Sequence, residues 1–170
     1  MRPIGGFFLL ALVALLLRST ALSSLATRGV VLDALAFVTV VWALRHGDAW
    51  GASFGFFVGL MADLDAAHWL GRHALLLTLL GYAVGRLAGT LVRDSARTQF
   101  ALIAAGVLAH QLWASAFELG GGVVGLPYLA GRSLMATAAT AAVGTLLLAL
   151  LRRIAGRPLF RHASRTTTKD

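Results

Sequence analysis

The sequence predicts an all-α integral membrane protein, a bundle of six transmembrane helices. The composition is 58% apolar and only 13% charged, and the mean hydropathy is +0.80, far from the values of a soluble domain of this length. Charged residues also divide the chain into six apolar segments, which at about 20 residues each would use about 120 of the 170 residues. We therefore expect a six-span domain over residues 1–151 and a basic cytoplasmic tail over 152–170.

Each expected span is bounded by charged or flexible residues. The spans cover residues 4–25, 30–44, 49–64, 70–91, 98–119 and 125–151. The first resembles a signal peptide, because Met1-Arg2 gives it a basic start, but Arg18 directly after the apolar core is atypical and favours a retained membrane anchor. The later spans are separated by a tight turn at 45–48, a polar link at 63–68, a polar patch at 93–97 and a glycine hinge at 120–122.

Basic residues sort onto alternate connections, which checks the six-span arrangement independently. One side collects 11 basic residues: Arg2, Arg45, Arg86, Arg93, Arg97, Arg152, Arg153, Arg157, Arg161, Arg165 and Lys169. The other side holds 4: Arg18, Arg28, Arg72 and Arg132. Both termini are therefore expected in the cytoplasm, and the net charge of +8 reports topology rather than nucleic-acid binding.

Two glycine stripes mark the third and fourth spans. Glycines recur at every fourth position in each: Gly51, Gly55 and Gly59, then Gly81, Gly85 and Gly89. Because four helical residues turn about 400°, each set forms a stripe without side chains, which lets another helix approach closely in a membrane. The stripes are expected to be helix-packing sites, within the chain or with a partner's helix.

A serine and a histidine give the strongest enzymatic hypothesis. Ser53 lies in a G-x-S-x-G string, and His110 lies two spans later. In the expected topology the two residues differ in depth by roughly 12 Å, whereas a nucleophile and its base must be in hydrogen-bond contact. The hydrolase turn also needs a preceding strand. We therefore expect a protein that is not an enzyme.

Metal and cofactor sites are not expected either. The chain has no cysteine, which excludes thiolate ligands and disulfides. Its other candidate ligands are His46, His68, His73, His110, Asp63 and Asp65. None forms an i, i+4 histidine pair with a third ligand, so interfacial polar residues explain them adequately.

Ionisable residues inside the expected spans say more about function than the candidate metal ligands do, since such groups are usually paired or functional in a membrane. Asp33, Asp63, Glu118 and Arg132 all fall toward the outer side. We expect Arg132 to pair with Asp33 or Glu118, the alternative being that each reaches the interface separately. His110 and its neighbour Gln111 lie in mid-span, where they would form hydrogen bonds between helices or, less favoured, line a small polar cavity.

Residues 33–97 resemble the rod shape-determining protein MreD family. An aspartate opens the second span, a Leu44-Arg45-His46-Gly47 turn follows, and the first glycine stripe ends on Asp63. Leu70-Gly71-Arg72-His73-Ala74-Leu75 and then Gly81-Tyr82 with Gly85-Arg86 complete the pattern. The family usually has proline before the aspartate, where this chain has Leu32.

The resemblance implies a non-enzymatic inner-membrane scaffold of the bacterial cell-elongation machinery. Its implied direct partner is MreC, a single-span protein with a periplasmic domain. MreB and the RodA/penicillin-binding-protein synthases of peptidoglycan would belong to the same assembly. The family is also similar in fold to the substrate-binding subunits of energy-coupling-factor transporters. A vitamin-binding transporter subunit is therefore the alternative function.

Overall fold

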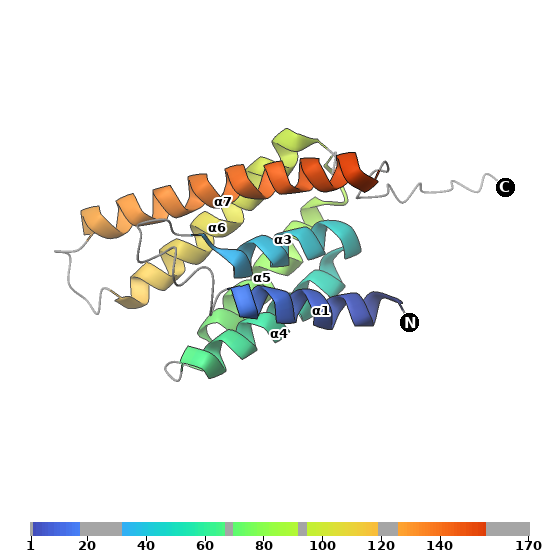
Figure 1. Ribbon diagram of the computed structural model, residues 1–170. Helices are drawn as coiled ribbons and strands as arrows, with labels where there is room; N and C mark the ends of the chain where they lie inside the picture. Colours follow the sequence, from blue (N-terminus) through green and yellow to red (C-terminus); the bar gives the residue numbers. More distant parts are fainter. Residues whose placement is uncertain (1, 18–31, 67–69, 92–94, 119–125, 156–170) are drawn as a thin grey trace.

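The computed structural model describes residues 2–17, 32–66, 70–91, 95–118 and 126–155. Within these ranges the chain forms six helices and no strand (Figure 1). The helices are α1 (Arg2–Leu17), α3 (Ala34–His46), α4 (Asp48–Ala66), α5 (Arg72–Leu87), α6 (Ala96–Glu118) and α7 (Leu126–Ala155). The all-helical prediction is thus confirmed for the described part of the chain.

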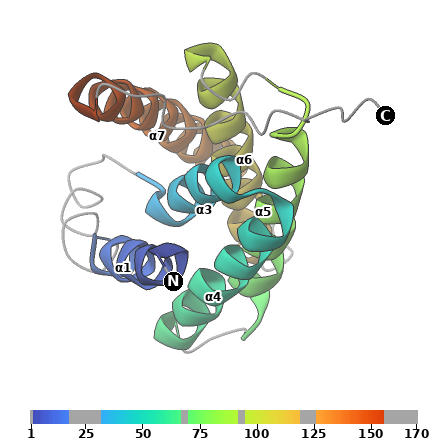
Figure 2. The same ribbon diagram turned by 90° about the vertical axis from the view of Figure 1, so that its right-hand side faces the viewer.

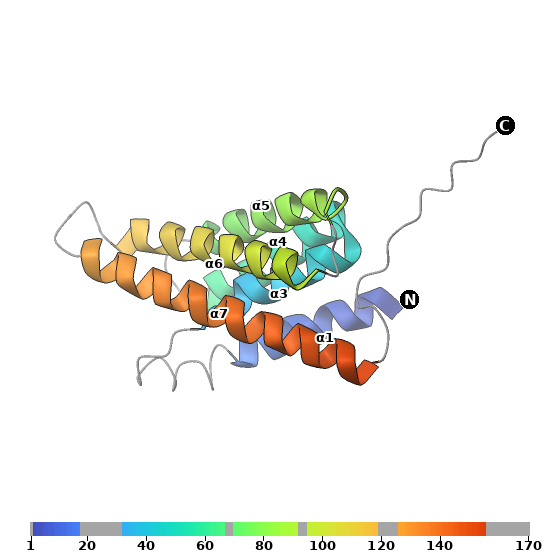
Figure 3. The same ribbon diagram turned by 90° about the horizontal axis from the view of Figure 1, so that it is seen from above.

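The short helix α3 occupies the centre of the bundle. It contacts each of the other five described helices, and in the view of Figure 2 they surround it. Eight of its 13 residues are buried, although at about 1.5 Å per residue it spans only about 20 Å. The beginning of α1 and the end of α7 lie at one end of the molecule (Figures 1 and 3).

Two apolar clusters form the core, and α3 contributes to both from opposite faces. Val40 and Leu44 of α3 pack with residues of α5, α6 and α7 in the first cluster. Leu35, Val38 and Trp42 of α3 pack with α1, α4 and α5 in the second, where the Trp42 ring stacks on Phe54 at a centroid distance of 5.0 Å. Since α1 supplies buried Phe7, Ala11 and Ala14 to the second cluster, it is an integral part of the bundle.

Two glycines with positive φ allow the sharp changes of direction around α4 and α5. Gly47 (φ +88°) is the single residue between α3 and α4, and its N–H closes the end of α3 by donating to the Ala43 carbonyl. Gly71 (φ +95°) directly precedes α5. Other residues adopt this left-handed region at a cost, so both turns favour glycine. The tight turn expected at residues 45–48 is present.

The boundaries of α3, α5 and α7 differ from the expected spans. α3 begins at Ala34 rather than near Val30, because the Asp33 carboxylate accepts a hydrogen bond from the Ala36 N–H and caps the helix. α5 is shorter than predicted at both ends. α7 continues past the predicted end at Leu151 to Ala155 and includes Arg152 and Arg153 in its last turn, where cations are favoured by the helix dipole. The predictions for residues 18–31, 120–122 and 156–170 lie outside the described residues.

α7 is the described helix that is long and apolar enough to cross a membrane, over Pro127–Ile154. Gly5–Leu17 and Ala34–His46 are apolar but shorter. α4 carries Asp48 in its first turn and Asp63 and Asp65 near its end, which lowers its average apolarity. Six full spans therefore remain a prediction.

Candidate functional site

The glycine stripes of α4 and α5 pack directly against each other in an antiparallel pair. A Cβ added to Gly51 would lie 2.5 Å from the Gly81 carbonyl oxygen, and one added to Gly55 would overlap the Leu77 carbonyl. A Cβ on Gly59 would lie 2.5 Å from the Ala74 Cα. These are backbone atoms that cannot move aside like a side chain, so the contact requires glycine at each position.

The same contact includes most of the second stripe. A Cβ on Gly81 would overlap the Gly51 carbonyl, and one on Gly85 would overlap the backbone of Gly47 and Asp48. Gly89 differs, because it lies in the turn after α5 and a Cβ there would meet only the Arg86 carbonyl, at 3.2 Å. The two stripes therefore pack against each other, and the faces in contact are not open to the helix of another protein. Packing within the chain, the first of the two roles expected for the stripes, is present for these five glycines.

Asp63 joins the end of α4 to the beginning of α5. Its carboxylate is fully buried and accepts hydrogen bonds from the backbone N–H groups of Gly71 (2.9 Å), His73 (3.0 Å) and Ala74 (3.1 Å). The first N–H groups of a helix have no partner within the helix, so Asp63 of α4 acts as the cap of α5. The His73 ring adds an Nδ1 contact of 2.7 Å to the same carboxylate.

Asp33 connects three helices at the same end of the bundle. Its carboxylate caps α3 and also contacts His110 Nδ1 and Gln111 Nε2 (3.1 Å) of α6. Its backbone N–H donates to the Thr140 hydroxyl of α7 at 2.9 Å. Asp33 and His110 are both more than nine-tenths buried, so the pair forms a polar connection in the interior of the bundle.

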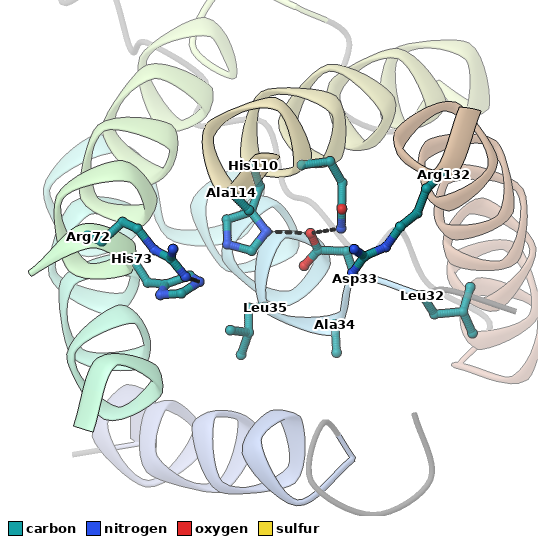
Figure 4. A pocket seen from close by; sticks show the side chains of 10 residues that line it. Leu32, Asp33, Ala34, Leu35, Arg72, His73, His110, Ala114 and Arg132 are labelled. Atoms are coloured by element: carbon teal, nitrogen blue, oxygen red, sulfur yellow. Dashed lines mark hydrogen bonds and ion pairs between the residues drawn. The ribbon is translucent and has the colours of Figure 1, made fainter. Parts of the chain in front are cut away.

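The histidines of the two acid–histidine pairs lie side by side at a polar pocket (Figure 4). The rings of His73 and His110 have centroids 5.4 Å apart. The pocket has a volume of about 230 Å³. Its lining includes both histidines, Asp33 and Gln111, and two arginines, Arg72 and Arg132, approach it from α5 and α7. Both roles considered for His110 and Gln111 are thus realised, since they bond between helices and line a cavity.

The structure places Ser53 away from this group. Its hydroxyl donates to the Ala49 carbonyl of its own helix at 2.9 Å, whereas His110 Nδ1 is bound to Asp33. Ser53 therefore has the environment of a small packing residue and lacks the base contact that a nucleophile needs. Among the residues that could be searched, no three histidine, aspartate or glutamate side chains are arranged to hold a metal ion. His68 lies outside the described residues.

The predicted ion pair of Arg132 had two candidate acids. The first candidate, Asp33, forms hydrogen bonds with His110 and Gln111. Arg132 lines the same pocket as Asp33 (Figure 4). Glu118 ends α6, and its side chain lies outside the described residues. The sequence did not reveal the pairing of Asp63 with His73. The two residues are ten positions apart, on either side of the connection between α4 and α5. If the two helices are treated as an antiparallel pair, this spacing indicates the contact.

Comparison with protein families decides the assignment. The model of the family described as rod shape-determining protein MreD matches residues 1–155. The chain belongs to the MreD family. The match includes all six described helices, and so extends well beyond residues 33–97, which carry the resemblance in the sequence. Searches of curated proteins and of solved structures found no match.

Membership places the chain among membrane proteins that determine rod shape together with the other Mre proteins. The family is one of structural, shape-determining proteins, and the polar groups described above suit that class. Asp33, Asp63 and His73 each connect one helix to another.

Proposed function

We propose that this protein is a non-enzymatic membrane scaffold of the bacterial cell-elongation machinery, which docks MreC and thereby supports peptidoglycan synthesis and cell-shape control. The match of the family model to residues 1–155 carries the proposal. In the proposed arrangement the six helices span the inner membrane with both termini in the cytoplasm, and MreB and the RodA/penicillin-binding-protein synthases belong to the same assembly.

The packing of the bundle supports a scaffold role. The α4–α5 seam, defined as the contact between the stripes Gly51/Gly55/Gly59 and Gly81/Gly85, brings two backbones together with no side chain between them. Asp33 and Asp63 then connect helix ends through buried hydrogen bonds. Such a unit offers a partner a fixed surface, which limits the ordering cost of docking.

The partner's helix would pack on the outward surface of the bundle, since the seam is filled. α7 offers exposed apolar side chains along its length, including Leu134 (61% exposed), Leu146 (70%) and Ile154 (75%). In a membrane these side chains contact lipid or another helix. A single-span partner such as MreC fits a surface of this kind.

The transporter alternative is not proposed. Ligand pockets for molecules of drug size usually measure about 300–1,000 Å³, and the polar pocket measures about 230 Å³. A whole vitamin would need a larger cavity.

Depletion in a rod-shaped host tests the proposal directly. Cells depleted of the protein are expected to become round, and the wild-type gene should restore rods. Ser53→Ala should restore them equally well, because its hydroxyl bonds only within its own helix. In detergent extracts the tagged chain should co-purify MreC. Rods that persist after complete depletion would exclude the shape role, and round cells without MreC co-purification would exclude the docking mechanism.

A further inference from the structure

The contacts of His73 fix the position of the proton on its ring. Arg72 Nη2 lies 3.5 Å from His73 Nε2. Because a guanidinium group donates hydrogen bonds and never accepts them, this ring nitrogen is the acceptor and carries no proton. The proton of His73 is therefore on Nδ1, which donates to the Asp63 carboxylate at 2.7 Å. In this arrangement His73 is a neutral ring.

His110 has a second ring nitrogen without a proton. Its Nδ1 donates to the Asp33 carboxylate, which also accepts from the Gln111 amide. Its Nε2 is buried and forms no hydrogen bond within the described part of the chain. A charged ring would leave a buried N–H donor there without an acceptor, so the neutral form fits the site better. Nε2 is thus the atom at which His110 would take up another proton.

The formal charges around the two rings balance while both rings are neutral. Asp33 and Asp63 bond to the histidines, and Arg72 and Arg132 line the same pocket. These groups come from α4, α5, α7 and the residue before α3. Two carboxylates and two guanidinium groups have no net charge, so each ring proton adds one positive charge. Both histidines and both acids are more than nine-tenths buried, where charges are poorly screened.

We propose that His73 and His110 form a pH-sensitive connection, which holds α5 against α6 while both rings are neutral and weakens when both are protonated. The ring centroids lie 5.4 Å apart, so two imidazolium rings would repel each other across this contact. A charged His73 would also lose its hydrogen bond from Arg72 and place two cations side by side. Ionisable groups this close bind their protons as a coupled pair.

The sign of the pH dependence follows from the number of protons bound. A histidine in water is half protonated near pH 6.5, so the unfolded chain takes up both protons as the pH falls below that value. The folded pair resists the second proton. The folded chain therefore binds fewer protons than the unfolded chain, and the free energy of unfolding decreases as the pH falls. In the expected topology this end of the bundle lies on the outer side of the membrane.

Spin-label distances in the full chain, purified in detergent, test this proposal. Because the sequence has no cysteine, Leu75→Cys and Leu112→Cys place the only two labels near the histidines, at exposed positions of α5 and α6. Their distance should lengthen, or its distribution broaden, between pH 7.5 and pH 5.5. Leu87→Cys and Phe100→Cys form the matched control pair, exposed at the other end of the same two helices, and their distance should stay constant.

A double variant tests whether ring protons cause the change. In His73→Asn/His110→Asn each asparagine retains an N–H donor for its acid but has no protonation site, so the distance near the histidines should be the same at both pH values. The wild-type melting temperature should fall by about 3–5 °C, which corresponds to one histidine proton displaced by about one pH unit in a chain of this size. That of the double variant should fall less than half as much. His46→Asn, at the far end of α3, is the control and should behave like the wild type.

Three results would overturn the proposal: an equal change at both label pairs, a full pH response in the double variant, or a constant distance near the histidines in the wild type. Circular dichroism at each pH establishes that the helices are intact. The single variant His73→Asn provides the same comparison if the double variant does not fold, because the repulsion needs both rings. None of these readouts depends on MreC.

Discussion

Asp33 joins parts of the chain that are distant in the sequence. It caps α3, holds His110 and Gln111 of α6, and donates its backbone N–H to Thr140 of α7. These partners lie 77 to 107 residues away in the sequence. Buried polar groups are costly when one partner is removed, so stability should depend strongly on this side chain.

Asp33→Ala is expected to destabilise the protein by about 3 kcal/mol, because it leaves His110 and Gln111 buried without their acceptor. Thermal unfolding in detergent would measure the effect. Asp65→Ala is the control, since Asp65 is exposed near the end of α4. Equal melting temperatures for the two variants would contradict the role assigned to Asp33.

The pairing itself can be isolated with a double-mutant cycle. Because Asp33 and His110 are in direct contact, the loss in Asp33→Ala/His110→Ala should be smaller than the sum of the two single losses, by about 1 kcal/mol or more. Strictly additive losses in the same melting experiment would show that the two side chains are energetically independent.

At the scale of elements, α4 and α5 behave as one unit. Along the seam the backbones of the two helices are in direct contact. At one end of the pair, Asp63 of α4 caps α5. Glycine normally costs a helix roughly 1 kcal/mol relative to alanine. Here alanine would be worse, because its methyl group would overlap the facing helix.

Gly55→Ala should therefore lower the yield of folded protein sharply, with a loss of about 1–3 kcal/mol from overpacking. Gly131→Ala is a matched control within a helix, since a Cβ there has no neighbour within 4 Å, and it should be neutral or slightly stabilising. Size-exclusion chromatography of detergent extracts would compare the two. Full recovery of folded Gly55→Ala would contradict the packing described for the seam.

At the scale of the whole molecule, the arrangement in the membrane is the property to test. The asymmetry of 11 against 4 basic residues predicts cytoplasmic activity for a reporter fused after Asp170 and periplasmic activity for one inserted at Gly121. Reporter enzymes that are active on only one side of the membrane would read each position. Both reporters on one side would exclude the six-span topology.

The order of the six described helices could be predicted from the sequence because charged residues and glycines interrupt the apolar segments. How the helices face one another could not. The spacing of Gly51, Gly55 and Gly59 shows a small-residue face but does not say which helix covers it. For the same reason the acid–histidine pairs escaped prediction: Asp33 and His110 meet only after α3 and α6 have packed, and no local pattern joins them.

The hydrogen bonds of Asp63 have a consequence for the order in which helices enter the membrane during biosynthesis. All of its described hydrogen-bond donors belong to residues that emerge from the ribosome after it. If α4 entered the bilayer alone, it would carry this acid near its end without those partners. An aspartate at the centre of a membrane helix raises the free energy of insertion by about 2.5–3.5 kcal/mol, which is an upper bound for this position. Insertion of α4 and α5 as a preformed hairpin avoids that penalty, because the later helix supplies the donors before the pair leaves the translocon.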